Sequence, residues 1–460
     1  MKILSITTQK PHSTGSGIYL TELVRSWDRL GIRQAVVAGI YPEDTVCFPE
    51  GVSFYPVYYT SRKTAASGSQ EASHPDAELS AAPHISYPVL GMSDVMPYES
   101  TLYSSLNDAM ADEMLAAFRK AVSAACRELQ PDLIFCHHLY LLTAAVPTMI
   151  DDLASEGVWS ERPKIVGLSH GSDLRQFANT AFRREEIGQG IRKLDRILAL
   201  HEEQASDIAR LYGIPEAAIE VANSGYNPDL FYRCEKSGEG AASSAALNTP
   251  EEQTEHDAVN ILYAGKLSRE KGLLPFLDAL ARIGKAEDAP TFRLLLAGGC
   301  RDEVIKAYLT DEEELLPGPL TKLPFDAEYL GMLTQEELAA AFRAGDLFVL
   351  PSYYEGLPLV LIEAMACGLR IITSALPGVR PWIESKIDHS RALYVEPPAF
   401  EAPGIPVPSE VPGFSARLEE AISEALRDCS EEHVGVRERV FADTSRATWD
   451  GVAKNIIDLI

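Results

Sequence analysis

Short apolar runs alternate with amphipathic segments along the first half of the chain. Runs rich in β-branched residues predict strands, and apolar positions that recur every three or four residues predict helices. The first strand is expected at Ile3–Thr7, followed by a helix from Ile18 to about Leu30 that Gly31 ends. Alternation of this kind is typical of a parallel sheet with helices on both faces. Further strands are predicted at Gln34–Ala38, Asp132–Cys136, Ile165–Leu168 and Arg196–Leu200, with a helix at Ala109–Leu129.

The same alternation restarts in the second half of the chain. Thr334 and Glu337 form a capping box at the start of one of its helices. The stretch Val395–Pro412 carries six prolines and predicts an irregular surface loop. Strands are predicted at Val259–Ala264, Phe292–Ala297, Leu347–Leu350 and Arg370–Thr373, and helices at about Leu273–Ile283, Gln335–Ala344 and Leu357–Ala366.

Two such series predict an α/β fold with two doubly wound, Rossmann-like domains. The segment Cys234–Asp257 is rich in Gly, Ser and Ala and then acidic, which predicts a flexible connection. We expect the domain boundary just before it, near Ser224–Arg233. The N-terminal domain would then comprise residues 1–224 and the C-terminal domain residues 225–443.

The charge balance narrows the possible partners. The 460 residues carry 41 Lys and Arg against 67 Asp and Glu, a formal net charge of −26. This acidity argues against nucleic-acid binding and against docking on an anionic membrane through a broad basic face. No apolar run approaches the length of a membrane span, and the start of the chain turns polar too soon for a signal peptide. We therefore expect a cytoplasmic protein without an integral membrane segment.

Cysteine usage supports the same location. The seven cysteines are odd in number and form no Cys-x-x-Cys pair, which is typical of reduced thiols and not of a disulfide framework. His137 and His138 follow a predicted strand and could line a cleft. No third ligand stands at a recognised spacing, so no metal site is expected.

The sharpest chemical signal follows the strand predicted at Leu347–Leu350. The next residues read PSYYEGLPLVLIEAMACG, which places Glu355 and Gly356 where open α/β sheets bind ligands. Gly356 would let a ligand approach the backbone, and Pro358 suits a first helical turn whose N–H groups favour a phosphate. Glu363 could point at a ribose diol, and Glu355 could reach a sugar hydroxyl. The open alternative is that both carboxylates are solvated charges.

A second cluster, Tyr263–Gly272, also follows a strand and precedes a helix. Lys266 and Lys271 bracket its turn in an otherwise acidic domain. Two ammonium groups that converge there would hold a diphosphate and stabilise its charge as it leaves. A solvated charged loop is the alternative.

Two further candidates lie in the N-terminal half. His170 precedes Gly171 at a strand end, where it could bond a substrate hydroxyl or carbonyl, although a lone histidine is more often structural. The loop Gly15-Ser16-Gly17 follows the first strand, but Leu20 stands where a dinucleotide fingerprint needs its third glycine. This weakens an NAD interpretation, while a short Gly loop before a helix still suits a phosphate or acceptor contact.

Taken together, these motifs resemble the family-four retaining glycosyltransferases of GT-B fold (glycosyl transferases group one), over nearly the whole chain. The strongest mark is the Glu-x7-Glu motif, here Glu355 and Glu363. Gly265–Gly272, His170–Asp173 and the segment Asn223–Phe231 support it in order and spacing. The resemblance implies two Rossmann-like domains that face each other across a cleft, with the last helix, at about 444–460, crossing back onto the N-terminal domain.

The resemblance also implies roles for these residues. The C-terminal domain would bind a nucleotide-diphosphate sugar, with a UDP-sugar favoured, and the N-terminal domain would receive the acceptor. Lys271 would contact the diphosphate together with Lys266, where the family usually has an arginine and its bidentate fork. Glu363 would bind the ribose, and His170 would contact the sugar near the reacting carbon. Glu355 and the backbone of Gly356, Leu357, Pro358, Leu359 and Val360 would hold the sugar, Gly331, Met332 and Leu333 would edge the base, and Gly15, Ser16 and Gly17 would lie against the diphosphate and acceptor.

The implied reaction is metal-independent, cofactor-free transfer of a hexosyl group with retention of configuration, as part of carbohydrate biosynthesis. A soluble or small acceptor is favoured over a lipid because the chain is acidic. The alternatives are a nucleotide-sugar epimerase or a phosphorylase of the same architecture, and a non-catalytic nucleotide-sugar-binding protein. Intact Glu355, Glu363, Lys266 and Lys271 argue against a degenerate site.

Overall fold

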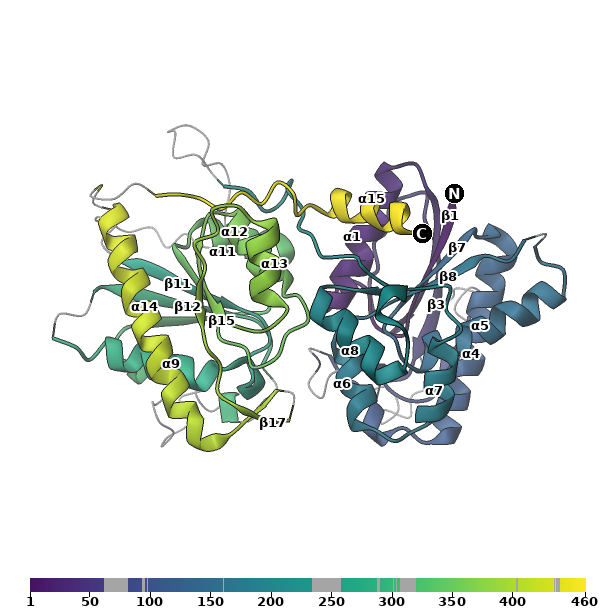
Figure 1. Ribbon diagram of the computed structural model, residues 1–460, viewed down its shortest axis with the longest axis horizontal. Helices are drawn as coiled ribbons and strands as arrows, with labels where there is room; N and C mark the ends of the chain where they lie inside the picture. The colour runs from purple at the N-terminus through teal and green to yellow at the C-terminus, as the bar shows by residue number, and fades with distance from the viewer. Residues whose placement is uncertain are drawn as a thin grey trace. The chain divides into compact units, whose positions relative to one another are not determined.

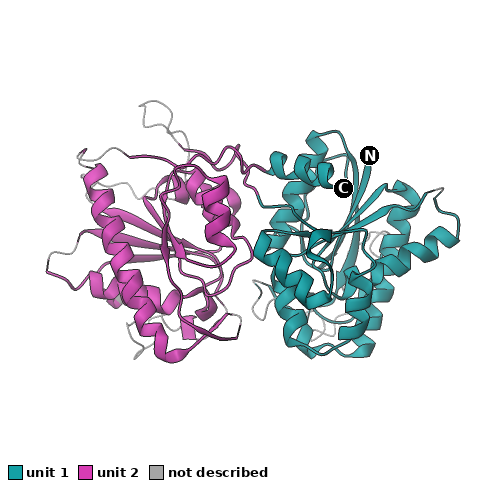
Figure 2. Ribbon diagram, in the orientation of Figure 1, with its two compact units in different colours: residues 1–224, 449–460 teal, residues 225–448 magenta. Residues whose placement is uncertain are grey.

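A computed structural model describes residues 1–61, 82–92, 96, 98–159, 161–233, 258–287, 290–300, 302, 304–306, 320–402, 404–433, 435 and 439–460. The predicted flexible segment Cys234–Asp257 lies wholly outside these ranges. The chain forms two compact units, coloured separately in Figure 2. Unit 1 comprises Met1–Ser224 and Trp449–Ile460, and unit 2 comprises Gly225–Thr448. Within the described residues, no helix combines the length and apolarity needed to cross a bilayer.

Unit 1 is built on one large parallel sheet with helices packed against it (Figure 1). Its strands are β1 (Lys2–Thr7), β2 (Arg33–Ile40), β3 (Ser53–Tyr59), β4 (His84–Ile85), β7 (Leu133–His137), β8 (Lys164–Leu168), β9 (Arg196–Ala199) and β10 (Ile219–Val221), with a separate short pair, β5 (Leu90–Gly91) and β6 (Thr101–Leu102). Its helices are α1 (Gly15–Arg29), α4 (Asp108–Leu129), α5 (Leu141–Ser155), α6 (Ser172–Asn179), α7 (Arg184–Ile191), α8 (Glu202–Tyr212) and α15 (Trp449–Leu459).

The strand order of the unit 1 sheet is β10-β9-β8-β7-β1-β2-β3-β4. Strand β2 shows how both faces are covered, because its successive side chains point to opposite faces. Ala35 and Val37 belong to the large core that includes α4, whereas Val36 and Ala38 pack with Leu20 of α1 and its neighbours. A strand buried on both faces needs a continuous apolar run, which is the pattern that predicted it.

Unit 2 contains a second parallel sheet, of strand order β13-β12-β11-β14-β15-β16. These strands are β11 (Val259–Ala264), β12 (Phe292–Ala297), β13 (Asp326–Gly331), β14 (Leu347–Leu350), β15 (Arg370–Ser374) and β16 (Leu393–Val395), and a short antiparallel pair is formed by β17 (Phe400–Ala402) and β18 (Ile405–Pro406). The helices are α9 (Leu273–Ile283), α11 (Gln335–Arg343), α12 (Leu359–Ala366), α13 (Val379–Lys386) and α14 (Val411–His433).

Two predictions about the C-terminal part are corrected. The stretch Val395–Pro412 is not wholly irregular, since it contains the ribbon β17–β18 and the start of α14. The last helix begins at Trp449 and not near residue 444. Before it, Thr444 donates a hydrogen bond from its hydroxyl to the hydroxyl of Tyr226 (2.9 Å), a contact inside unit 2.

The capping box predicted for α11 is confirmed. The Thr334 hydroxyl accepts from the Glu337 N–H (3.2 Å), and the Glu337 carboxylate accepts from the Thr334 N–H (2.8 Å). We expect Thr334→Ala to lower the free energy of unfolding by about 1 kcal/mol, because a helix-end N–H loses its acceptor. Chemical denaturation measures this loss, and Thr334→Ser is the matched control. Equal losses in both variants would contradict a capping role.

Candidate functional site

The candidate site in unit 2 lies where the strand order reverses. Strands β11 and β14 are neighbours, and β12 and β15 extend the sheet from them in opposite directions. Ligands of doubly wound sheets bind beyond the carboxyl ends of the strands at such a reversal. The loop after β11 carries Lys266 and Lys271, and the loop after β14 carries Glu355. The sheet therefore brings the two predicted motifs to one edge.

Lys271 and Glu355 are in direct contact. The Lys271 ammonium lies 2.7 Å from Glu355 Oε1, and their side chains are only 20% and 15% exposed. The Ser352 hydroxyl donates to the same carboxylate oxygen at 2.6 Å. The backbone joins the two loops as well, since the Tyr353 N–H donates to the Glu270 carbonyl (3.0 Å). A cation from one predicted motif and a carboxylate from the other are thus held side by side.

Close backbone packing sets the shape of these loops. Gly272 has φ +64°, and a Cβ atom there would lie 2.0 Å from the Pro351 carbonyl oxygen. A Cβ atom on Gly298 would lie 1.7 Å from the carbonyl oxygen of Gly265. The buried Tyr263 donates from its hydroxyl to the Lys266 carbonyl (2.7 Å). Side chains at either glycine would displace the backbone that carries the lysines.

The helix after Glu355 starts later than predicted. α12 begins at Leu359, with Pro358 as its N-cap, and not at Leu357. Gly356 and Val360 are partly exposed, whereas Leu357, Pro358 and Leu359 are buried. Glu363 is 4% exposed and lies within α12.

The predicted base-edge segment connects β13 to α11. Gly331 has φ +71°, and its carbonyl accepts from the Gly298 N–H (2.7 Å). Met332 is 62% exposed, and its sulfur approaches Gly299. Leu333 is half-buried. An exposed, flexible thioether at a strand end is a suitable surface for a planar ring.

In unit 1, Gly15, Ser16 and Gly17 are not a loop but the first turn of α1. Thr14 is the N-cap, and its hydroxyl accepts from the Gly17 N–H (3.3 Å). A Cβ atom on Gly17 would lie 2.6 Å from the Lys10 carbonyl oxygen, so the turn needs glycine there. The early N–H groups of a helix have no carbonyl partner within it, which keeps this turn suitable for an anion.

His170 belongs to a histidine cluster at the carboxyl ends of β7 and β8, next to the strand reversal of the unit 1 sheet between β1 and β7. His170 Nε2 lies 3.0 Å from His137 Nδ1, and its ring centroid lies 4.7 Å from that of His138. The Tyr19 ring of α1 packs edge-on against His170 at 5.2 Å. Among the described residues, no group of three or more His, Cys, Asp or Glu side chains could hold a metal ion.

Two rings of the cluster, His137 and His170, are uncharged at neutral pH because burial lowers the pKa of each. Burial, followed by the nearby His138, lowers the pKa of His137 to about 3. Burial, His138 and His137 together lower the pKa of His170 well below its usual value. Neutral imidazoles can each donate one hydrogen bond and accept another.

Sequence reasoning included in its motifs, but gave no role to, two residues that position the site. Asp173 is fully buried, and its carboxylate accepts from the backbone N–H groups of Leu139 (2.7 Å) and His170 (3.0 Å) and from the Ser169 hydroxyl (3.1 Å). It thereby joins the loops after β7 and β8. Ser352 orients Glu355 in unit 2. In both cases the signal was a polar residue three positions from a predicted site residue.

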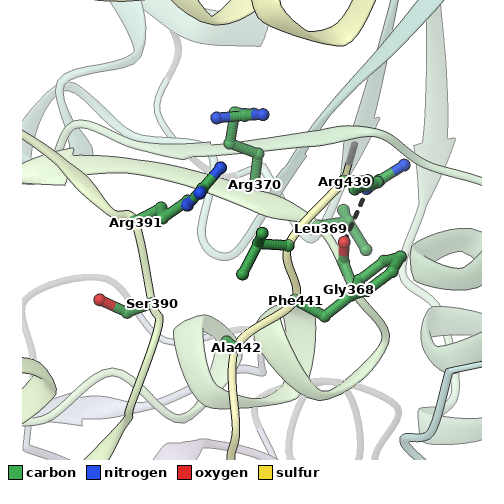
Figure 3. Close-up of a pocket in the computed structure, with 9 residues that line it drawn as sticks. Gly368, Leu369, Arg370, Ser390, Arg391, Arg439, Phe441 and Ala442 are labelled. Carbon is green, nitrogen blue, oxygen red and sulfur yellow. Dashed lines mark hydrogen bonds between the residues drawn. The ribbon is translucent and has the colours of Figure 1, made fainter. Parts of the chain in front are cut away.

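A small pocket lined by three arginines lies elsewhere in unit 2 (Figure 3). Arg370 is the first residue of β15, so the pocket lies at the amino-terminal edge of the parallel sheet, opposite the edge that carries the candidate site. Arg370 is paired with Asp428 and Glu432, and Arg439 with Asp346. None of the residues in these pairs belongs to the candidate site.

Comparison with known families assigns both units. Residues 106–230 match the family described as "Glycosyltransferase Family 4", and residues 258–402 match "Glycosyl transferases group 1". A D-inositol 3-phosphate glycosyltransferase 1 from Catenulispora acidiphila is 29% identical over 216 residues, 44% of this chain and 47% of that protein. A D-inositol 3-phosphate glycosyltransferase from Mycobacterium bovis is 26% identical over 197 residues, 42% of this chain and 36% of that protein. The matches thus span less than half the length of these curated relatives.

Solved structures share the fold at low sequence identity. Sucrose-phosphate synthase from Thermosynechococcus elongatus aligns with a TM-score of 0.59 and 18% identity, covering 100% of this chain and 98% of that one. Anabaena HepE in complex with UDP-glucose aligns with a TM-score of 0.54 and 14% identity, covering 100% and 99%. With two doubly wound parallel sheets, this confirms the predicted GT-B fold class. The chain belongs to the family-four, group 1 glycosyltransferases.

Proposed function

We propose that this protein transfers a hexosyl group from a nucleotide-diphosphate sugar to an acceptor hydroxyl with retention of anomeric configuration. A UDP-sugar is the favoured donor, because a structural neighbour binds UDP-glucose. The observation that carries the proposal is the contact of Lys271 with Glu355 at the strand reversal of unit 2, on the loop that also carries Lys266. A diphosphate and a sugar hydroxyl are the adjacent groups that such a pair would recognise.

The chemistry follows from the charges at this edge of the sheet. As the bond from the sugar to the diphosphate breaks, negative charge grows on the leaving oxygen. The ammonium groups of Lys266 and Lys271 and the N-terminal turn of α12 would stabilise that charge without a metal ion. Glu355, already oriented by Ser352, would hold the sugar through a hydroxyl, and Glu363 would bind the ribose.

Unit 1 would supply the remaining contacts. We assign the side of the sugar near the reacting carbon to His170, and the diphosphate and acceptor to the first turn of α1. The inositol phosphate named for the curated relatives is a small polyol. It supports a small hydroxylated acceptor, in preference to a lipid, for this chain.

A thermal-shift panel with UDP-, GDP- and ADP-sugars tests donor binding. A donor present at 100 times its Kd stabilises the native state by about 2.7 kcal/mol, so the correct nucleotide should raise the melting temperature. No response to any nucleotide sugar would overturn the proposed donor class.

Turnover separates an enzyme from a binding protein. We expect Glu355→Gln to keep the thermal response to the donor and to lose most donor hydrolysis and transfer, because the amide keeps only one acceptor oxygen and replaces the other, with the negative charge, by an NH₂ donor. NMR of the product would show the same anomer as the donor. Binding without turnover by the wild-type protein on a range of acceptors would instead favour the non-catalytic alternative.

A further inference from the structure

The contact between His137 and His170 indicates which of their ring nitrogens carry a hydrogen. The two rings are nearly parallel, at 12°, and one nitrogen of each lies in the contact, His137 Nδ1 and His170 Nε2, 3.0 Å apart. Both imidazoles are neutral, so one nitrogen of this pair carries a hydrogen and the other does not. The surroundings of the nitrogens outside the contact, His137 Nε2 and His170 Nδ1, determine which of the two hydrogen placements is favoured.

The other nitrogen of His137 is buried without a partner. His137 is 4% exposed, and its Nε2 atom has no hydrogen-bond partner among the described residues. If that nitrogen carried the hydrogen, a buried N–H donor would be left unsatisfied. If it is bare, only an acceptor lone pair is unsatisfied, which proteins tolerate more often than an unsatisfied donor. The hydrogen of His137 is therefore placed better on Nδ1, inside the contact.

The geometry points to His137 as a positioning residue that donates from Nδ1 to His170 Nε2, so that His170 carries its only hydrogen on Nδ1. His170 is partly exposed, and Nδ1 is its nitrogen outside this contact. It therefore offers a ligand a hydrogen-bond donor and not a base. In the proposed reaction, on which this role rests, His170 would donate to an oxygen of the sugar or of the departing phosphate and would not remove the acceptor proton.

The backbone around His170 supports a fixed ring. Asp173 accepts from the His170 N–H, and the edge-on Tyr19 ring limits rotation of the imidazole. The Tyr19 hydroxyl is itself held by the Asn223 carbonyl (2.9 Å). Asp173 and Tyr19 thus restrain the backbone and the ring of His170. The contribution of His137 is to set which nitrogen of His170 carries the hydrogen.

Two-bond ¹H–¹⁵N correlation spectra of the histidine-labelled protein test this directly, without substrate. We expect His170 to show a protonated Nδ1 and a bare Nε2, with its signals assigned by their loss in His170→Asn. Exposed His84 is the control, since His84→Asn should leave the His170 signals unchanged. A hydrogen on His170 Nε2 in the wild-type protein would overturn the proposal, whatever the protein's activity.

Two variants at position 137 test the consequence for turnover. His137→Asn keeps an N–H donor near the position of Nδ1 and should retain kcat to within about threefold. His137→Leu loses the donor and should lower kcat by about tenfold, the size of one hydrogen bond, with the donor KM little changed. Equal losses of kcat in both variants would show a purely structural role and would contradict the proposal. Absence of transfer in the wild-type protein would refute the proposed function but leave the tautomer result standing.

Discussion

Replacement of Lys271 by methionine is expected to lower kcat for sugar transfer by a factor of about 100 to 1,000, the usual effect of removing one preorganised group that stabilises charge in a transition state. The Lys271 ammonium is 20% exposed and is held by Glu355, so it is in place before the diphosphate begins to leave. Steady-state kinetics with the donor identified by thermal shift measures the loss.

Matched variants separate this effect from a general change of charge. Lys285 is an exposed lysine just after α9, and Lys285→Met should retain wild-type kcat. Lys271→Arg replaces the ammonium by a guanidinium of the same charge but different geometry, and its kcat should lie between those of the wild type and Lys271→Met. The melting temperature of Lys271→Met should stay close to that of the wild type, because partly exposed ion pairs add little stability. A wild-type rate in Lys271→Met would exclude this residue from the chemistry.

Unit 1 is expected to lose stability as the pH falls below about 6.5. The pKa of His137 is lowered from 6.5 to about 3 by burial and His138, and burial and Arg25 lower that of His12 to about 4. Between these values the unfolded chain binds protons that the folded chain does not, so acid favours unfolding, and full stability is present above pH 6.5. His137 alone should cost about 2 kcal/mol between pH 7 and pH 5. His12 and His170 act in the same direction.

Urea unfolding at pH 7 and pH 5, followed by tryptophan fluorescence, measures this dependence. The chain has four tryptophans, and Trp382 is the one in unit 2, so a Trp382→Phe background makes the signal report on unit 1. His137→Asn removes one titrating group and should recover about 2 kcal/mol of the acid loss relative to its own stability at pH 7. An unchanged pH dependence in that variant would mean that His137 is not buried in neutral form.

The apolar pattern predicted the central strands well and the edges poorly. The predicted bounds of β11, β12 and β14 agree with the structure, because strands that are mostly buried on both faces need largely apolar runs. Strand β13, with the sequence DAEYLG, was missed because an edge strand with partly exposed side chains has no such run. The long helix α14 was missed because Pro412 and Gly413 lie in its first turn and resemble a loop.

The candidate site was predicted as separate motifs, and their contacts were not. Each motif could be placed at a strand end. Strand β11 pairs with β14 although β12 and β13 lie between them in the sequence, so the contact of Lys271 with Glu355 depends on tertiary structure. His137 was considered only as a residue that could line a cleft, and as a metal ligand it was set aside because no third ligand stands at a recognised spacing. Its partner, His170, lies 33 positions away and meets it only because β7 and β8 are adjacent.

The position of α15 determines the order in which this protein can be completed during synthesis. The helix belongs to unit 1, where the Trp27 indole donates to the Ala453 carbonyl (3.2 Å). Trp449 packs edge-on against Tyr19, which in turn contacts His170. All residues of unit 2 are translated between the two parts of unit 1. A growing chain can therefore bury the core of unit 2 first. Trp27 and Tyr19 gain their contacts with α15 only after that helix is translated, so unit 1 is the last to finish folding.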